Sequence, residues 1–307
     1  MENTKLISAA RIPKKMHIPK GKLIAVGGNE DKGSDPNPKT RKRYTLDFFE
    51  LGILKRLLLE TGKLHPHVEV VTTASAIPLE VGDMYREAFL RLGIAELGVM
   101  HIRVAQDARQ PEYLERLRRC DCVMFSGGDQ SNITRAFNGS EFLTTMVARY
   151  YAETHFVIAG TSAGAMAMSK VMIAGGNPFE ALKKGAVKIS VGLGLIDPLI
   201  IDSHFVMRGR FARLMEAVAT HPHHLGIGLG EDTGVLITEG ARIETIGSNL
   251  VVIVDGADIG HSNAFSVGKG TMLSVENIKV HVLAKGNVYD IRQRKFYSSP
   301  AASLLTS

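Results

Sequence analysis

The feature that most constrains the fold is a regular alternation between short apolar segments and longer segments with apolar residues at helical spacing. Near-continuous apolar segments of this length are typical of strands that are buried on both faces. Strands are expected over residues 23–26, 68–73, 99–104, 122–125 and 156–159, with helices over 44–59, 79–92, 112–119 and 142–152. This alternation predicts an α/β fold, in which helices flank a mostly parallel sheet on both faces.

After about residue 233, strand-like segments follow one another with glycine-containing turns between them. They cover residues 235–238, 242–246, 250–254 and 279–283. No internal repeat is visible, and we interpret these segments as β-hairpins added to the same domain. The expected organisation is an N-terminal extension over residues 1–21, free to move, and a single α/β domain over residues 22–307.

The composition excludes several classes of protein. Of 307 residues, 45% are hydrophobic and 22% are charged, which is unlike a disordered, collagen-like or disulfide-rich chain. The net charge of +6 favours acidic partners, but the basic residues are spread along the chain and no nucleic-acid-binding motif is visible. No apolar segment approaches the ~20 residues that cross a bilayer. Neither a nucleic-acid nor a membrane partner is therefore expected.

The two cysteines, Cys120 and Cys122, lie at the start of an expected strand, where their side chains would point the same way. No further cysteine or histidine stands nearby at ligand spacing, so we interpret them as small buried residues and not as a metal site. The first 22 residues carry scattered basic side chains without a continuous apolar segment, so no secretory signal is expected. These features favour a reducing cytoplasm.

The strongest chemical signal is a G-x-S-x-G motif at residues 160–164, with the sequence GTSAG. It follows an expected strand and precedes a good helix start. In that context, small residues permit a sharp turn that exposes the Ser162 hydroxyl, and the Ala163 amide points at the oxyanion that forms in acyl transfer. Ser162 is therefore a candidate nucleophile; the alternative is a tight turn with a helix-capping serine.

A serine nucleophile needs a base, and the base usually needs an orienting carboxylate. His204 ends the apolar segment 199–204 at the sheet edge where Ser162 is expected, and we interpret it as the base. Glu231 follows another strand end and converges on the same edge. Asp202 and Asp232 are further candidates for the acid, Asp202 in a supporting role because it shares a strand face with His204.

Two further groups of residues follow expected strands. In the segment 127–132 (GGDQSN), Gly128 offers a second oxyanion donor and Gln130 a hydrogen bond to substrate, although an ordinary glycine turn explains the same residues. Arg208, Arg210 and Arg213 come shortly after His204. Arginines at this density usually form a solvated face, but beside a catalytic histidine they suggest a site for substrate carboxylates.

The histidines at positions 221, 223 and 224 form one further cluster. Metal binding there is the alternative to a solvated loop, and we interpret the cluster as a loop. No metal site and no organic cofactor is therefore expected.

Five ordered motifs resemble the cyanophycinases, a family of serine exopeptidases related to peptidase E. They are GGNEDK at 27–32, GGDQ at 127–130, GTSAGA at 160–165, DSHF with RGR within 202–210, and GLGEDT at 228–233. The resemblance covers about residues 22–295. It implies a fold like that of class I glutamine amidotransferases, which is flavodoxin-like, and a single hydrolytic domain over residues 22–307.

The resemblance also implies roles for individual residues. Ser162 is the nucleophile, His204 the general base and Glu231 the acid that orients it. The residues implied to line the substrate pocket are Gln130, Asp202, Ser203, Arg208, Arg210 and Arg213. Many cyanophycinases carry glutamine where this chain has Ser203, and the shorter serine side chain reaches less far.

The family hydrolyses cyanophycin, a poly-aspartate backbone with arginine attached to each β-carboxyl group. It releases β-Asp-Arg dipeptides, typically as a homodimer. Two alternatives remain open: an aspartyl dipeptidase of the peptidase E type, and a non-catalytic module that holds a peptide or polymer. The complete set of Ser162, His204 and Glu231 argues against the second, because a binding module needs no such set.

Overall fold

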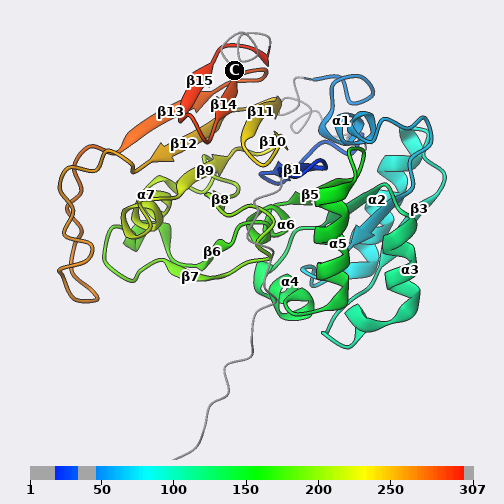
Figure 1. Ribbon diagram of the computed structural model, residues 1–307, viewed down its shortest axis with the longest axis horizontal. Helices are drawn as coiled ribbons and strands as arrows, with labels where there is room; N and C mark the ends of the chain where they lie inside the picture. The colour runs from blue at the N-terminus through cyan, green and yellow to red at the C-terminus, as the bar shows by residue number, and fades with distance from the viewer. Residues whose placement is uncertain (1–17, 34–45, 301–307) are drawn as a thin grey trace, which may run out of the picture.

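The computed structural model describes residues 18–33 and 46–300. The mobility expected for residues 1–21 concerns mainly residues outside this description. Of that extension, residues 18–21 are described, and the Gly21 amide donates to the Tyr150 carbonyl at 2.8 Å. The described part of the chain forms two main sheets with helices around them (Figure 1).

The larger sheet has nine strands in the order β15-β14-β11-β10-β1-β5-β4-β2-β3. Its parallel strands are β1 (Lys22–Val26), β5 (Val157–Thr161), β4 (Cys122–Phe125), β2 (Val68–Val71) and β3 (Leu97–Met100). Antiparallel strands extend it beyond β1: β10 (Thr233–Thr238), β11 (Arg242–Gly247), β14 (Val288–Asp290) and β15 (Lys295–Tyr297). The predicted α/β fold with added C-terminal hairpins is confirmed.

Helices cover both faces of the parallel strands. One face carries α1 (Ile53–Glu60) and α2 (Pro78–Arg91). The other carries α3 (Pro111–Arg119), α4 (Gln130–Phe137), α5 (Glu141–Ala152) and α6 (Ala163–Ala167), with the short η1 (Asp107–Arg109) before α3. The helix expected over 44–59 is shorter than the sequence predicts, since α1 begins after Gly52, which has extended backbone angles.

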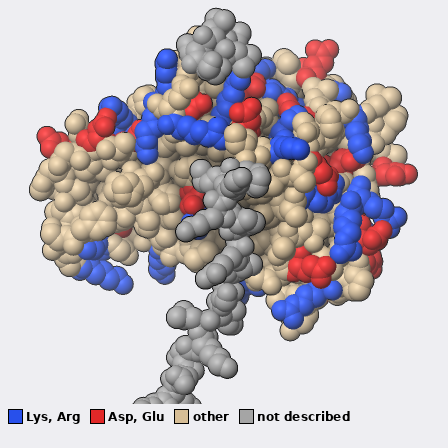
Figure 2. Space-filling model, viewed as in Figure 1, with Lys and Arg blue, Asp and Glu red and all other residues tan. Residues whose placement is uncertain are grey.

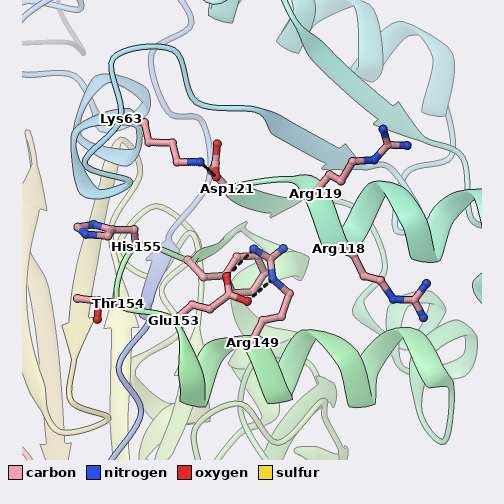
Figure 3. Close-up of a pocket in the computed structure, with 9 residues that line it drawn as sticks. Lys63, Arg118, Arg119, Asp121, Arg149, Glu153, Thr154 and His155 are labelled. Carbon is pink, nitrogen blue, oxygen red and sulfur yellow. Dashed lines mark hydrogen bonds and ion pairs between the residues drawn. The ribbon is translucent and has the colours of Figure 1, made fainter.

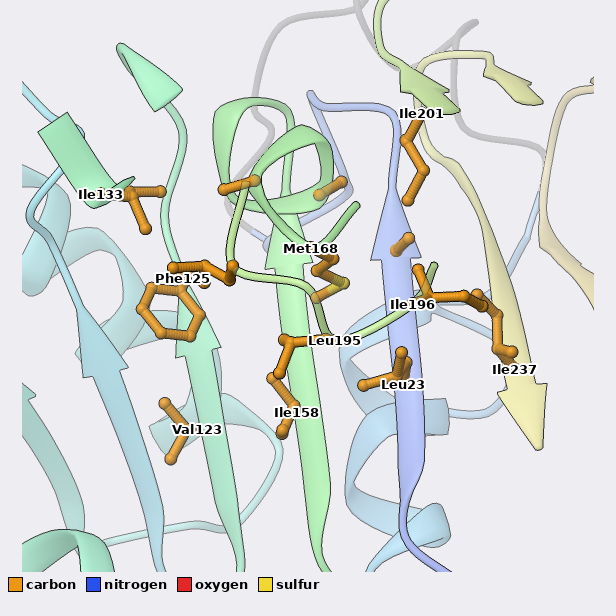
Figure 4. Close-up of a cluster of buried hydrophobic side chains, with 14 of the residues drawn as sticks. Leu23, Val123, Phe125, Ile133, Ile158, Met168, Leu195, Ile196, Ile201 and Ile237 are labelled. Atoms are coloured by element: carbon orange, nitrogen blue, oxygen red, sulfur yellow. The ribbon is translucent and has the colours of Figure 1, made fainter. Parts of the chain in front are cut away.

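Alternate residues of each parallel strand point into different apolar clusters. In β1, Leu23 packs in the cluster beneath α3 to α6, whereas Ile24 packs in the cluster beneath α1 and α2. Figure 4 shows Leu23, Val123 and Ile158 from three neighbouring strands side by side in the first cluster. A sheet buried on both faces explains why its strands are apolar throughout and not alternating.

The two cysteines are both buried, but the expectation that they point the same way is wrong. Cys120 lies in the cluster beneath α3 to α6 and Cys122 in the opposite one. The reason is that Cys120 caps the end of α3 and does not belong to β4.

A second sheet of four strands stands beside the first, in the order β13-β12-β9-β8. It consists of β8 (Leu199–Asp202), β9 (Leu225–Leu229), β12 (Val251–Asp255) and β13 (Lys279–Leu283), and β8 and β9 run parallel. Helix α7 (Phe211–Thr220) packs against it through Leu214 and Val218. The strands expected at 250–254 and 279–283 thus pair with each other, but in this second sheet.

Backbone hydrogen bonds join the two sheets at the end of β1. The Gly27 carbonyl accepts from the His204 amide at 2.8 Å, and the Gly28 carbonyl accepts from the Asp232 amide at 2.9 Å. The Val26 carbonyl accepts from the Ser162 amide at 2.8 Å. The carboxyl ends of β1, β5, β8 and β9 therefore meet at one place.

A hairpin that the sequence pattern does not predict follows α6. It consists of β6 (Val171–Gly175) and β7 (Lys188–Val191), with the short helix η2 (Pro178–Glu180) in the connection. The buried Glu216 carboxylate on α7 holds this connection by accepting three backbone N–H groups, from Leu182 (2.9 Å), Gly185 (3.1 Å) and Val187 (3.1 Å). The hairpin is thereby fixed to α7.

The central position of Ile158 in β5 makes it a test of this core. Replacing Ile158 with alanine removes fully buried side-chain atoms and leaves a cavity, so the free energy of unfolding should fall by about 2–5 kcal/mol. Urea unfolding measures the change. Leu64, which is 86% exposed, is the matched control, and Leu64→Ala should change the same quantity by less than ~0.5 kcal/mol. Equal effects of the two variants would contradict this account of the core.

Candidate active site

Ser162 sits on a strained turn between β5 and α6. Its backbone angles are φ 51° and ψ −109°, in the region with positive φ that non-glycine residues rarely adopt. The turn is sharp because its neighbours are small: a Cβ on Gly160 would lie 2.5 Å from the Gly164 carbonyl carbon, and one on Gly164 would lie 2.3 Å from the Phe125 carbonyl oxygen. The Ser162 side chain remains partly exposed.

His204 contacts both Ser162 and Glu231. Its Nε2 lies 3.0 Å from the Ser162 Oγ, and its Nδ1 lies 2.9 Å from a Glu231 carboxylate oxygen. A proton on Nδ1 that is donated to Glu231 leaves the Nε2 lone pair facing the serine hydroxyl. His204, like Ser162, has a positive φ, 47°. The arrangement is that of a nucleophile, a base and an orienting acid.

The other two candidate acids are engaged elsewhere. Both Asp202 oxygens accept hydrogen bonds from arginines. Asp232 accepts from the Asp31 amide at 3.0 Å and from the Ser248 hydroxyl at 2.6 Å. Burial raises the pKa of Asp232 to about 6. Among the three candidates, Glu231 alone has a hydrogen bond to the His204 ring.

The environment of His204 favours its neutral form. Burial lowers its pKa below the ordinary value of 6.5, because desolvation disfavours the charged ring. The hydrogen bond that the ring donates to Glu231 opposes this shift, while the positive charges of Arg208 and Arg210 add to it. His204 is 8% exposed, whereas Arg208 is exposed, so water screens the charge of Arg208 in part. A neutral imidazole is the form that can accept a proton from serine.

Two glycine turns lie against the reacting groups. Gly28 has φ 105°, and a Cβ there would lie 2.4 Å from Cε1 of the His204 ring. At Gly127, a Cβ would lie 3.4 Å from the Ser162 Cβ. Gly128, with φ 142°, packs so closely that its Cβ would lie 2.0 Å from the Ala74 carbonyl oxygen. The segment 127–128 and the start of α6 at Ala163 therefore flank Ser162, and their oxyanion roles stay predictions.

Gln130 begins α4, and its side chain is directed toward the β6–β7 hairpin. Its amide nitrogen donates to the Ile173 carbonyl at 2.8 Å, while Asp129 caps the helix by accepting from the Ser131 amide at 2.8 Å. The contact with substrate predicted for Gln130 stays a prediction. The hydrogen bond from Gln130 to Ile173 joins the 127–130 turn to β6.

A cavity of about 430 Å³ opens beside the turn that follows His204. It is lined by Gly176, Pro178, Phe179, Met207, Arg208, Gly209, Arg210 and Arg213. All three predicted arginines thus border one cavity. The Arg208 amide donates to the His204 carbonyl at 3.0 Å, so the cavity adjoins the His204 segment directly.

The two residues before His204 lie beneath this cavity and do not line it. Asp202 is fully buried and pairs with Arg213 through two hydrogen bonds and with Arg210 at 3.2 Å. The Ser203 hydroxyl donates to the Met166 sulfur at 3.2 Å. Asp202 therefore holds the arginines in place, and the substrate contacts predicted for Asp202 and Ser203 stay predictions.

Arg210 is held with little solvent around it. Burial, together with the charges of Arg213 and Arg208 and against the opposing effect of Asp202, lowers its pKa from 12.5 to about 10. Its Nε is buried and has no hydrogen-bond partner within the described residues. An anionic group in the cavity would stabilise the buried charge of Arg210 and could accept a hydrogen bond from its Nε.

A buried network that the sequence analysis assigned no role supports the turn before Ser162. The Glu30 carboxylate accepts from the Thr161 hydroxyl at 2.6 Å, from Lys32 at 2.9 Å and from the Tyr85 hydroxyl. Burial by itself would raise the Glu30 pKa, but Lys32 and these hydrogen bonds lower it below its ordinary value. The sequence signal that could have pointed to Glu30 is its position in the GGNEDK motif.

A second cavity, of about 350 Å³, lies at the opposite edge of the sheet, near the starts of β4 and β5 (Figure 3). Four of its charged side chains are paired with one another, Arg149 with Glu153 at 2.6 Å and Lys63 with Asp121 at 2.7 Å. Arg118 and Arg119 pair with Glu141 and Glu115, which lie outside the cavity lining. The Arg149 guanidinium also lies over the Phe156 ring, 4.0 Å from its centre. These pairs already satisfy the cavity's charges, and Ser162 lies at the other end of β5.

His221, His223 and His224 lie in the loop after α7. His224 approaches Asp197 at 3.8 Å, and His221 Nδ1 lies 3.1 Å from the Ala217 carbonyl oxygen. No group of three or more histidine, cysteine or acidic side chains in residues 18–33 and 46–300 is placed to hold a metal ion. In the same ranges, no helix is both long and apolar enough to cross a membrane.

Comparison with known proteins identifies the family. Residues 51–245 match the family model described as peptidase family S51. The chain belongs to this family. A cyanophycinase from Synechococcus elongatus is 32% identical over 273 residues, which is 89% of this chain and 80% of that protein. A cyanophycinase from Geminocystis herdmanii is 31% identical over 268 residues, 87% of this chain and 93% of the relative.

A solved structure supports the fold of this family S51 peptidase. The crystal structure of a peptidase from an acI-B1 Actinobacterium superposes with a TM-score of 0.61 and 18% identity. The match covers 89% of this chain and 98% of that one. The likeness therefore extends over both sheets and is not confined to the parallel strands.

The protonation of His204 can be tested without a substrate. NMR titration, with the signal assigned by its loss in His204→Asn, should give a pKa below 6.5. In Arg208→Gln the pKa should rise, because removal of a nearby positive charge makes protonation easier. The acid limb of kcat/KM should then move to higher pH. Arg118→Gln, at an exposed site, is the control and should cause no shift; an unchanged pKa in Arg208→Gln would contradict this account.

Gly28 tests how closely the His204 ring must approach the backbone. In Gly28→Ala, the new methyl group would displace the ring, and labelling of Ser162 by a phosphonate should slow by about 10²-fold. Gly139→Ala is the matched control, because Gly139 also has a positive φ (76°) but open space around it. If both variants react at the same rate, backbone strain and not contact with His204 explains the effect.

Proposed function

We propose that this family S51 peptidase is a serine exopeptidase that hydrolyses cyanophycin to β-Asp-Arg dipeptides. The observation that carries the proposal is the pair of hydrogen bonds that His204 makes to Ser162 and Glu231. The names of its relatives supply the substrate, since proteins 31–32% identical over most of the chain are cyanophycinases. Residues 22–307 would act as one hydrolytic domain.

The first half of the reaction forms an acyl-enzyme. Ser162 Oγ attacks the backbone carbonyl carbon of a β-substituted aspartate while His204 Nε2 takes the hydroxyl proton. Glu231 stabilises the resulting imidazolium through Nδ1. The amides of Gly128 and Ala163 hold the tetrahedral oxyanion, and one such donor contributes about 3–4 kcal/mol.

The second half regenerates the enzyme. The carbon–nitrogen bond breaks as His204 returns its proton to the leaving amine, which departs. Water then attacks the ester carbon while His204 takes its proton. The bond to Ser162 Oγ breaks, His204 returns the proton to Oγ, and the carboxylate product leaves. Each step uses a proton carried by His204, which is consistent with the lowered pKa that keeps the ring neutral beforehand.

The arginine cavity supports preference for a chain end that bears carboxylates. All three arginines line the cavity, and a guanidinium binds a carboxylate with two parallel hydrogen bonds. Because Arg213 already donates two hydrogen bonds to Asp202, Arg208 and Arg210 would bind the substrate carboxylate. In Figure 2, by contrast, positive and negative side chains are interspersed over the face shown, without the single-sign stripe that a nucleic acid would follow. We further propose a homodimer in the cytoplasm, as in the sequence interpretation.

Incubation with purified cyanophycin tests the proposal. Mass analysis should show β-Asp-Arg as the dominant product, and a serine-directed phosphonate should label the wild type but not Ser162→Ala. Ser162→Ala should lower the rate by about 10⁴–10⁶-fold, because it removes the nucleophile.

Two outcomes would contradict this function. Faster hydrolysis of short aspartyl dipeptides than of polymer would favour an aspartyl dipeptidase of the peptidase E type. Retained activity in Ser162→Ala would exclude the serine mechanism, and absence of labelling with retained polymer binding would favour a non-catalytic module.

A further inference from the structure

One of the residues that line the arginine cavity carries an exposed aromatic ring. Phe179 lies in η2, lines the cavity and is 92% exposed. Single exposed apolar residues are common on proteins and need no explanation. Phe179 differs because it borders a cavity that also contains three arginines and adjoins the His204 segment.

The backbone that carries this ring is held by hydrogen bonds on both sides of it. Asn177 caps η2 by accepting from the Phe179 amide at 3.0 Å, and Pro178 fixes the first backbone angle of the turn. The connection that follows is bound to α7 through Glu216. Arg213 reaches the carbonyl of Gly176, before η2, at 3.4 Å. Both walls of the cavity are therefore anchored to α7.

The residue after Phe179 in η2 is Glu180, which is not itself among the residues that line the cavity. Glu180 is exposed and makes no ion pair with any lysine, arginine or histidine in the described ranges. The cavity is thus lined by guanidinium groups near His204 and by an aromatic ring on η2, and η2 also carries an exposed carboxylate. A ligand that suits both sides carries an anion and a cation on the same unit.

We propose that Phe179 and Glu180 form a subsite for the guanidinium group of a β-linked arginine, with Phe179 stacking on its plane and Glu180 pairing with its charge. The arginines on the opposite wall would bind the α-carboxylate of the same unit. This rests on the proposed function, because such a unit is what the polymer presents. A guanidinium is planar, stacks on aromatic faces and pairs with carboxylates, so it suits this pair of side chains.

The test compares two substrates whose side chains differ mainly in the charge of the terminal group. One is a short oligomer of β-Asp-Arg, and the other carries citrulline, whose neutral urea has nearly the same shape as the guanidinium. The wild type should have a lower KM for the arginine oligomer. In Phe179→Ala, that KM should rise about three- to tenfold with kcat little changed, whereas the KM for the citrulline oligomer should change much less.

Matched variants separate stacking from apolar contact. Phe179→Trp should retain the preference for arginine, while Phe179→Leu, which keeps apolar bulk without an aromatic face, should lose it. Glu180→Gln should raise the KM for the arginine oligomer selectively. Phe265→Ala is the control, since Phe265 is also highly exposed (71%) but lines neither cavity described above, and it should change nothing.

A binding measurement tests this subsite independently of catalysis. Calorimetry on Ser162→Ala should show tighter binding of the arginine oligomer than of the citrulline oligomer, and adding Phe179→Ala should remove the difference. If the wild type hydrolyses neither oligomer but this difference is present, the proposed function fails and the subsite stands. If Phe179→Ala weakens both ligands equally, or resembles Phe265→Ala, the subsite is wrong.

Discussion

The structure depends on the close approach of the His204 ring to the backbone at Gly28. That approach is possible because position 28 has no Cβ and a positive φ, while the carbonyls of residues 27 and 28 bind amides from the segments after β8 and β9. One turn after β1 thereby fixes where the second sheet meets the first. Ser162 comes from the first sheet, and His204 and Glu231 from the second, so the triad exists only when the two sheets are joined.

Two buried carboxylates near this junction, Asp202 and Glu30, are paired with cationic side chains. Asp202 neutralises part of the charge of Arg210 and Arg213, and Glu30 is neutralised by Lys32. Burying a single charge costs several kcal/mol, whereas a pair with good hydrogen bonds recovers much of that cost. Because one carboxylate faces two buried guanidiniums, the cavity keeps an excess of positive charge, which also lowers the His204 pKa.

The apolar alternation was enough to predict the α/β fold and the edge at which Ser162, His204 and Glu231 lie, because strand ends and glycine turns are local signals. It could not assign β8 and β9 to a second sheet, since apolar strands of both sheets have the same appearance in a sequence. The β6–β7 hairpin was missed for a related reason: its position depends on Glu216 and Gln130, which bind its backbone from distant parts of the chain. Pairings of that kind leave no local periodicity.

Residues at the junction of the two sheets and residues that line the cavity differ in how far they can vary. The reacting groups are held by backbone hydrogen bonds and by glycines that tolerate no Cβ, so they allow little variation. Ser203, where many cyanophycinases carry glutamine, is buried and directed at Met166, and its hydroxyl is not among the groups that line the cavity. Under the proposed function, recognition of the substrate would fall on the exposed Arg208 and on the hairpin residues that line the cavity. Side chains there, unlike those at the junction, can change without disturbing the bonds that hold His204 beside Ser162.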